Sequence, residues 1–272
     1  MTDITNGNLN LETQNQPVVV LPKVMSAKTF NRIYGGHETL GGVYKLHQKI
    51  VAELLATLLF VFGVISCNVY NPGLPAMLGS SAIGGVMIYI FGRVSGAHFN
   101  PAISLALFIR QKLSGMEFGL YVLAQIVGAF LACLFFVLCH RGNFTYFAGN
   151  EIGAAIYDVD GKDGWSYIGA LIMEIILTFI LIMFILASCE KDNYLGASLG
   201  LAFSLVLLGC SVAGSMVSGC AMNPARSLAP AFMQWFKVDF KNPIKQIWIY
   251  LVGPFVGAII AAFVWPIFIF ES

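Results

Sequence analysis

The tripeptide Asn-Pro-Ala occurs twice in the chain, as Asn100-Pro101-Ala102 and as Asn223-Pro224-Ala225. Asn is a preferred helix N-cap and Pro is a preferred first helical residue. Each tripeptide therefore predicts a helix start, at which the Asn oxygen accepts backbone N–H bonds and the Asn NH₂ group is left to donate. Each helix start also carries about half a positive charge. The pair indicates a donor-rich, positive site without a formal charge.

Two opposed amides of this kind would each donate a hydrogen bond to one water molecule between them. The hydrogens of that water must then point away from the amides, along the axis in both directions. This orientation interrupts the directed chain of hydrogen bonds along which a proton hops, and the positive potential repels cations. Such a site favours the passage of neutral molecules and the exclusion of ions.

The composition indicates where the two tripeptides lie. The 272 residues are 58% hydrophobic and only 11% charged, with a mean hydropathy of +0.79. A soluble domain has roughly 25% charged residues. The composition excludes an ordinary cytosolic enzyme, a secreted disulfide scaffold and a disordered protein, and it indicates a polytopic membrane protein.

Charge and cysteine usage exclude further classes. The net charge of +1 gives no support to nucleic-acid binding. The six cysteines form no CxxC pair, so we expect neither a metal site nor a disulfide framework. The chain has no nucleotide-binding loop and no HExxH motif, so we expect no cofactor and no enzyme activity.

Six apolar stretches are long enough to cross a bilayer as helices, which takes about 20 residues. Helix is the expected state because an open strand edge in lipid leaves backbone groups unpaired. The predicted spans are Ile50–Cys67, Leu74–Phe91, Phe118–Cys139, Ile168–Cys189, Leu195–Val217 and Ile247–Phe270.

Two further segments, Pro101–Arg110 and Pro224–Met233, are too short to span. Ten residues of helix cover about 15 Å, which is half of the hydrocarbon core. Half-length helices at membrane depth require an end that is buried in protein or lines a wet cavity. We expect them to enter from opposite faces and to meet near the midplane.

The chain repeats itself. Glu53 and Glu174 are 121 positions apart, Asn100 and Asn223 are 123 apart, and the motif at 125–129 is echoed 129 positions later at 254–258. Each half contains three spans, so the halves must have inverted topology, which places a shared site at the midplane. The expected fold is an all-α membrane protein with six spans and two re-entrant half-helices.

The expected domains are a cytoplasmic tail at 1–46 and a channel domain at 47–270, with repeats at about 48–140 and 167–270. Of the 15 Lys and Arg residues, nine lie on the N-terminal side of the predicted topology and six on the other, which predicts cytoplasmic termini. The sequon at Asn143 then lies outside. The tail and the loop at 190–194 lie inside, where either could gate the inner mouth.

The segments at 95–102 and 219–227, which contain the two tripeptides, closely resemble the signature loops of the aquaporin (major intrinsic protein) family, and the resemblance covers roughly residues 48–270. It implies an hourglass pore in each subunit and a homotetramer in the lipid bilayer of the plasma membrane or an intracellular vacuole membrane. It supports Glu53 and Glu174 as braces of the two loops, rather than as a proton relay, with Gln125 in a similar role. Further expected pore-lining positions are Gly96, Ala97, His98, Gly219 and Ala221.

The resemblance also implies a four-residue selectivity filter. Counting from the two asparagines places it at Ser80, Ser211, Cys220 and Arg226, of which Arg226 would add a barrier to cations. Strict water channels of the family have Phe and His at the first two positions, so the two Ser residues predict a wider, more polar constriction. Ser227, where glycerol channels carry Asp, favours water.

We therefore expect a passive water channel that excludes protons and ions. The first alternative is a channel that also passes small neutral solutes such as glycerol, urea, hydrogen peroxide or metalloid acids. The second alternative is a secondary transporter, because inverted repeats with broken helices occur there too. A coupled transporter usually has a titratable residue at the midplane, whereas this chain has two neutral asparagines there.

Overall fold

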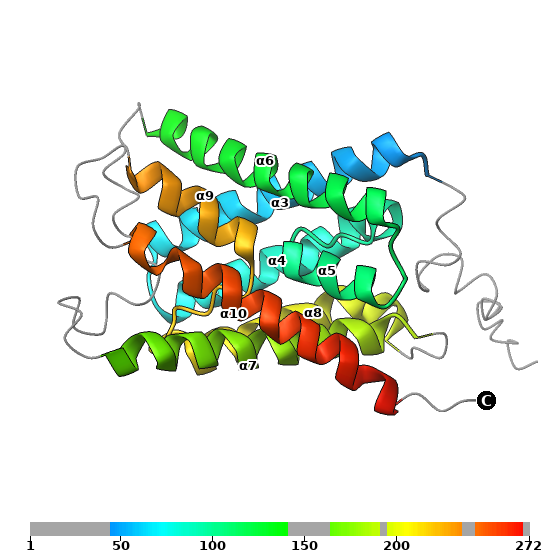
Figure 1. Ribbon diagram of the computed structural model, residues 1–272. Helices are drawn as coiled ribbons and strands as arrows, with labels where there is room; N and C mark the ends of the chain where they lie inside the picture. The colour runs from blue at the N-terminus through cyan, green and yellow to red at the C-terminus, as the bar shows by residue number, and fades with distance from the viewer. Residues whose placement is uncertain (1–43, 141–163, 191–194, 236–242, 269–272) are drawn as a thin grey trace, which may run out of the picture.

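The computed structural model describes residues 44–140, 164–190, 195–235 and 243–268. Within these ranges the chain is helical (Figure 1). Its elements are α3 (Leu46–Tyr70), α4 (Leu74–Ser95), α5 (Pro101–Ile109), α6 (Gly115–Cys139), α7 (Gly164–Ser188), the 3₁₀ turn η3 (Gly196–Ser198), α8 (Leu199–Gly214), α9 (Pro224–Trp235), α10 (Pro243–Val264) and the 3₁₀ turn η4 (Trp265–Phe268).

Six of these helices are long and apolar enough to cross a membrane, as the sequence predicts. They are α3, α4, α6, α7, α8 with its leading η3, and α10 with η4. Large apolar side chains such as Leu59, Phe135 and Phe263 are exposed on their outer faces. In a bilayer this apolar exterior faces lipid, so the fold is that of an integral multi-pass membrane protein.

The boundaries differ from the prediction by a few residues for local reasons. Helix α3 begins four residues before Ile50, because the Lys45 backbone N–H is bonded by Gln48 in a capping arrangement. The regular α10 ends at Val264 and tightens into η4, which contains Pro266. Proline lacks the N–H that would continue the α-helical ladder.

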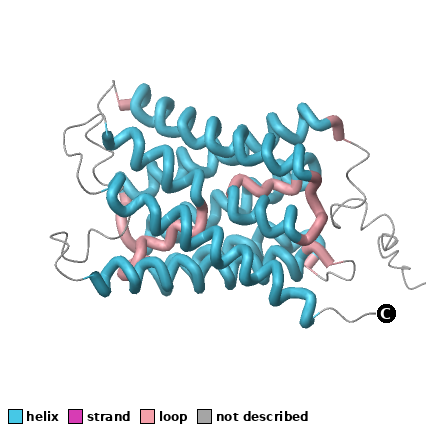
Figure 2. The backbone as a smooth tube through the Cα atoms, in the orientation of Figure 1, coloured by secondary structure: helices cyan, strands magenta, loops and turns pink. Residues whose placement is uncertain are grey.

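The two half-length helices form as predicted. Helix α5 has nine residues and α9 has 12, so at about 1.5 Å per residue neither can span the bilayer. They lie toward opposite ends of the bundle, and their starting ends approach each other at its centre (Figure 1). The loops that lead into them run through the middle of the molecule (Figure 2).

Close packing of helix pairs positions these loops. Helix α3 packs along α6, and α7 packs along α10. Glycine permits both approaches, because a Cβ added at Gly128 would lie 2.4 Å from the Leu54 carbonyl oxygen and one at Gly257 would lie 2.4 Å from the Ile175 carbonyl oxygen. The 129-residue offset between these glycines repeats the offset found in the sequence.

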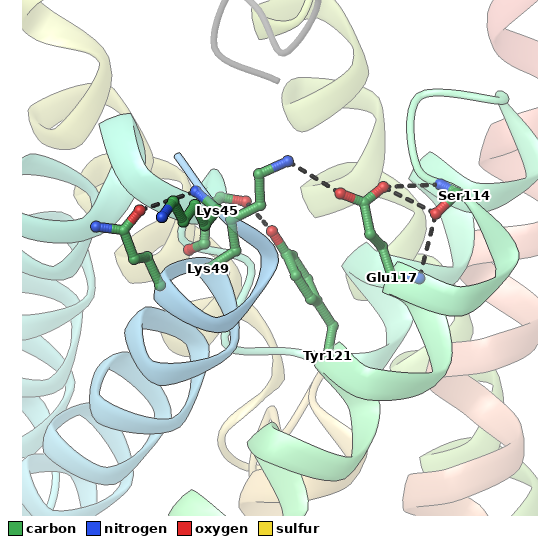
Figure 3. A network of polar contacts seen from close by, with 7 residues as sticks. Lys45, Lys49, Ser114, Glu117 and Tyr121 are labelled. Carbon is green, nitrogen blue, oxygen red and sulfur yellow. Dashed lines mark hydrogen bonds and ion pairs between the residues drawn. The ribbon is translucent and has the colours of Figure 1, made fainter. Parts of the chain in front are cut away.

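The start of α3 and the end of η4 lie at the same end of the bundle (Figure 1). At this end an ion pair between Lys49 and Glu117, 2.9 Å long, joins α3 to α6 (Figure 3). Glu117 also completes a capping box with Ser114 at the start of α6. The sequon at Asn143, most of the predicted tail and residues 191–194 of the proposed gating loop lie outside the described residues.

Candidate functional site

The carboxylate of Glu53 holds the loop that precedes α5. Glu53 is fully buried in α3. Its oxygens accept hydrogen bonds from the Ser95 hydroxyl (2.6 Å), the His98 N–H (2.9 Å), the Phe99 N–H (2.8 Å) and the Gln125 side-chain amide (2.8 Å). A buried carboxylate is stable only when such donors replace its hydration. Glu53 therefore shapes this loop from the neighbouring helix.

Glu174, on α7, has the matching position in the second half. It is fully buried and accepts hydrogen bonds from the Ser218 hydroxyl (2.6 Å), the Ala221 N–H (2.9 Å) and the Met222 N–H (2.7 Å). Each bonded loop residue lies 123 positions after its counterpart in the first loop. The two loops are therefore built alike.

The backbone of both loops adopts the same uncommon conformation. Ala97 and Phe99 have φ of 48° and 35°, and Cys220 and Met222 have φ of 51° and 50°. Non-glycine residues in this left-handed region are uncommon. Alternation of left- and right-handed residues turns successive N–H groups to one side, forming a concave anion nest. The two glutamates occupy these nests, which compensates the backbone strain.

The two asparagines cap the half-helices and link the loops. The Asn100 side-chain oxygen accepts from the Ala102 N–H (2.9 Å), and that of Asn223 accepts from the Ala225 N–H (3.1 Å). The Asn100 amide donates to the Met222 carbonyl (2.8 Å). The Asn223 amide donates in the same way to the Phe99 carbonyl (2.9 Å). Each asparagine amide therefore donates one of its two hydrogens to the opposite loop, and its second N–H makes neither of these two bonds.

Two tyrosines that the sequence analysis did not select also hold the loops. The Tyr121 hydroxyl donates to the Ser95 carbonyl (2.9 Å); Figure 3 shows the Tyr121 side chain with this bond as a dashed line. The Tyr250 hydroxyl donates to the Ser218 carbonyl (2.8 Å). Both rings are buried. The two tyrosines are 129 positions apart, so the repeat offset that relates α6 to α10 could have identified them.

His98, one of the expected pore-lining positions, is almost fully enclosed by the protein. Its side chain is 1% exposed, its Nδ1 lies 3.0 Å from the Ser104 hydroxyl, and its ring lies edge-on to Tyr121. The Gln125 amide also donates to the Ser104 hydroxyl (2.9 Å). The ring is therefore built into the network that holds the first loop.

The four predicted filter residues are only partly joined by contacts. Ser211 and Arg226 both lie close enough to the Cys220 thiol to influence its charge. A Cβ added at Gly214 would lie 3.4 Å from the Cys220 Cβ, so Cys220 rests against α8. Ser80 lies on α4, and its hydroxyl has no hydrogen-bond partner among the described residues.

The remaining predicted lining residues lie in the same two loops. Gly96 ends α4 with φ of 93°, and Gly219 takes the matching place with φ of 77°. Ala97 and Ala221 are buried. The structure thus gathers all residues from 95 to 102 and from 218 to 226 at the centre of the bundle.

An inverted pair of half-helices, capped by two asparagines inside a six-helix bundle, defines a class of membrane channel. The family model of the major intrinsic protein matches residues 43–265. The chain belongs to this family, so it is an aquaporin-type channel and not an enzyme.

Individual relatives agree with this assignment. The chain is 33% identical to Nodulin-26 of Glycine max over 265 residues, which cover 94% of this chain and 88% of that protein. It is 35% identical to Aquaporin NIP1-1 of Zea mays over 234 residues, covering 83% and 76%. The solved aquaglyceroporin of Plasmodium falciparum shares the fold, with a TM-score of 0.66 at 22% identity, covering 80% of this chain and 94% of that one.

Proposed function

We propose that the chain is a passive water channel that excludes ions and protons. The observation that carries this proposal is the crossed pair of amide bonds, Asn100 to Met222 and Asn223 to Phe99. Because each asparagine uses its oxygen for the cap and one hydrogen for the opposite loop, its remaining N–H has a fixed direction. Two fixed donors orient a passing water better than freely rotating amides would.

Proton exclusion follows from that orientation. A water that accepts two bonds from the amides turns both of its hydrogens outward, so the water chains on either side point in opposite directions. A proton cannot hop through a point where the direction reverses. The positive ends of α5 and α9 add a barrier to any cation.

Arg226 supplies the second barrier in this proposal. It lies in the first turn of α9, and its backbone N–H donates to the Asn223 oxygen (3.2 Å). Its side chain therefore stands one turn beyond the asparagine, beside Cys220. We assign Ser80, Ser211, Cys220 and Arg226 to the filter, and the two glutamates with Gln125 to the support of the loops.

Vesicles containing the purified protein test the water function. Osmotic shrinking should be faster than in empty vesicles, should not saturate and should not depend on an ion gradient. A pH-sensitive dye inside the vesicles should report no proton entry above the background of empty vesicles. Saturating, ion-dependent flux would favour a secondary transporter, and rapid proton entry would remove the proposal.

A wider channel for small neutral solutes is the second candidate. The specific observation is that both Ser80 and Ser211 are small, and the Ser80 hydroxyl has no protein partner within the described part of the chain. Swelling of the same vesicles in isotonic glycerol, urea or hydrogen peroxide, or in a metalloid acid, distinguishes the two candidates. Water flux without solute flux would leave the strict water channel.

We also propose a homotetramer with both termini in the cytoplasm. The support for the orientation is the excess of Lys and Arg on the N-terminal side together with the start of α3 and the end of η4 at one end of the bundle. Chemical labelling of single cysteines introduced at either end, in sealed cells, tests the orientation. The mass of the detergent-solubilised protein tests the tetramer.

A further inference from the structure

A chain of side-chain hydrogen bonds runs from Glu53 to His98 beside the first loop. The Gln125 amide nitrogen lies 2.8 Å from Glu53 Oε2 and 2.9 Å from the Ser104 hydroxyl oxygen. That hydroxyl oxygen lies 3.0 Å from His98 Nδ1. All four residues are at most 1% exposed, so bulk water cannot replace a missing partner.

The carboxylate fixes the direction of the first bond in this chain. Glu53 Oε1 accepts from the His98 N–H, and Oε2 accepts from the Phe99 N–H. Backbone N–H groups only donate, so both carboxylate oxygens act as acceptors. The Gln125 side chain must therefore turn its NH₂ group toward Glu53, and the second hydrogen of that group donates to Ser104. In this orientation the Gln125 oxygen has no donor among the described residues, so the bond to the charged carboxylate decides the orientation.

The remaining question is which acceptor takes the hydroxyl hydrogen of Ser104. A serine in a helix commonly returns it to the carbonyl four residues earlier. Ser227, which stands 123 positions after Ser104, makes this bond to the Asn223 carbonyl at 3.2 Å. Ser104 makes no such bond to Asn100 among the described residues, where its hydroxyl is paired with Gln125 and with the His98 ring. The hydroxyl hydrogen therefore has His98 Nδ1 as its acceptor.

The opposite direction would leave a buried donor unpaired. If His98 Nδ1 carried a proton, the Ser104 oxygen would accept from both the ring and the Gln125 amide, and its own hydrogen would have no acceptor. A buried donor without an acceptor is costly. This argument applies equally to a cationic ring, in which both nitrogens carry protons. A neutral imidazole that accepts at Nδ1 carries its proton on Nε2.

In the second half the equivalent positions cannot form such a chain. The repeat offsets place Ala221 where His98 stands and Pro254 where Gln125 stands. Neither of these side chains can donate or accept a hydrogen bond. Both halves brace their loops with a buried glutamate, so bracing alone does not require the chain. Its purpose must be sought at the ring of His98.

We propose that Gln125 and Ser104 are positioning residues that hold the His98 ring neutral, with its proton on Nε2. The orientation imposed by the charged Glu53 is passed through two neutral side chains to a titratable ring. The first loop then adds no formal charge next to Asn100, where the channel uses donors without a charge. This last consequence rests on the proposed function, because it takes the surroundings of Asn100 to border the passage.

Solid-state NMR of the protein in vesicles, with ¹⁵N-labelled histidine and at mildly alkaline pH, tests the tautomer. A ring nitrogen that carries a proton resonates far from one that does not. His98→Gln identifies the His98 signals by removing them. We expect a proton on Nε2 of His98 and none on Nδ1. A proton on Nδ1, in a neutral or a cationic ring, would overturn the proposal.

His140 is the matched control in the same spectrum. Its Nδ1 lies 2.6 Å from the Phe136 carbonyl oxygen, which can only accept a hydrogen bond. This ring should therefore carry a proton on Nδ1, the opposite of His98. The two histidines together show that the spectrum distinguishes the tautomers.

Two variants test the positioning residues themselves. Ser104→Ala removes the donor to Nδ1, so the Nδ1 signal of His98 should shift toward that of a nitrogen without a hydrogen bond. Gln125→Met keeps a side chain of similar size and frees the serine oxygen, so a second His98 signal with a proton on Nδ1 should appear. A His98 spectrum identical to wild type in either variant would contradict the role of that residue.

The wild-type spectrum tests the tautomer even if neither variant folds. Osmotic shrinking of the same vesicles separates this result from the water function. A wild-type protein with the expected tautomer and no water flux would overturn the proposed function and leave the tautomer standing.

Discussion

The side-chain amide of Asn100 donates to the carbonyl oxygen of Met222, 2.8 Å away, in the loop of the opposite repeat. Met222 directly precedes the second asparagine, and that asparagine makes the reciprocal bond to Phe99. The two halves of the chain are thus tied together at the point where the two half-helices begin. The same two bonds therefore hold the halves together and fix the direction of the remaining N–H of each asparagine.

Replacing Asn100 should separate capping from cross-linking. Asn100→Ser retains a capping oxygen but is too short to reach Met222, and the unpaired buried carbonyl should cost about 1–3 kcal/mol. Asn100→Ala also loses the cap, which adds about 1 kcal/mol. Thermal unfolding in detergent should rank wild type above N100S and N100S above N100A. Identical midpoints for all three would contradict a role for these bonds.

Gly128→Ala should weaken the packing of α6 on α3. The new methyl group would lie 2.4 Å from the Leu54 carbonyl oxygen, so the helices must move apart, at a cost of about 1–3 kcal/mol. Gly119→Ala on the same helix is the matched control, because its Cβ meets nothing within 4 Å. Thermal unfolding should show a loss for G128A and none for G119A. A similar effect of both substitutions would show that only helix propensity is being measured.

Tyr121→Phe should remove one hydrogen bond to the first loop without changing the packing of the ring. The Ser95 carbonyl loses its hydroxyl donor, and the expected cost is about 1 kcal/mol. The contact of the ring with His98 is retained. A calorimetric unfolding midpoint equal to that of the wild type would mean that water replaces the lost donor.

Mercurial reagents should block the channel through Cys220. This thiol lies beside Ser211 and Arg226, so a bound mercury atom would obstruct the filter. Cys220→Ser should remove the inhibition of vesicle shrinking, whereas Cys139→Ser, at an exposed position on α6, should leave it intact. Inhibition that persists in C220S would place Cys220 away from the passage.

Enlarging the filter side chains should restrict solutes before it restricts water. Ser80→Phe combined with Ser211→His introduces two bulky groups where the chain has two hydroxyls. If the wild type passes glycerol or urea, the double variant should lose that flux and retain osmotic shrinking. Solute flux that is unchanged in the double variant would show that Ser80 and Ser211 do not form the constriction.

Much of this architecture could be predicted from local patterns. Six apolar stretches of sufficient length, two capped segments too short to span and a repeat of three spans together require inverted halves. Asn100 and Asn223 are recognisable because the cap and the following proline are local signals. The end of α8 at Gly214 and the tightening of α10 into η4 were not apparent from hydropathy, which is insensitive to backbone geometry.

The partners of the loops depended on long-range contacts. The hydroxyls of Tyr121 on α6 and Tyr250 on α10 donate to the carbonyls of residues 95 and 218, which lie in the two loops. Nothing in the spacing of a single repeat indicates which carbonyl a buried hydroxyl will reach. The sequence shows that Pro254 stands in the second half where Gln125 stands in the first, but only the structure shows that the Gln125 amide donates to Glu53.

By itself the sequence determined that this chain is an inverted-repeat membrane bundle with two asparagine-capped half-helices, because span length, capping and repetition are properties of contiguous residues. Only the tertiary structure decided how the amides are used, with one hydrogen of each asparagine donated to the opposite loop. That outcome depends on the packing of α3 on α6 and of α7 on α10, which brings residues more than 120 positions apart within hydrogen-bonding distance.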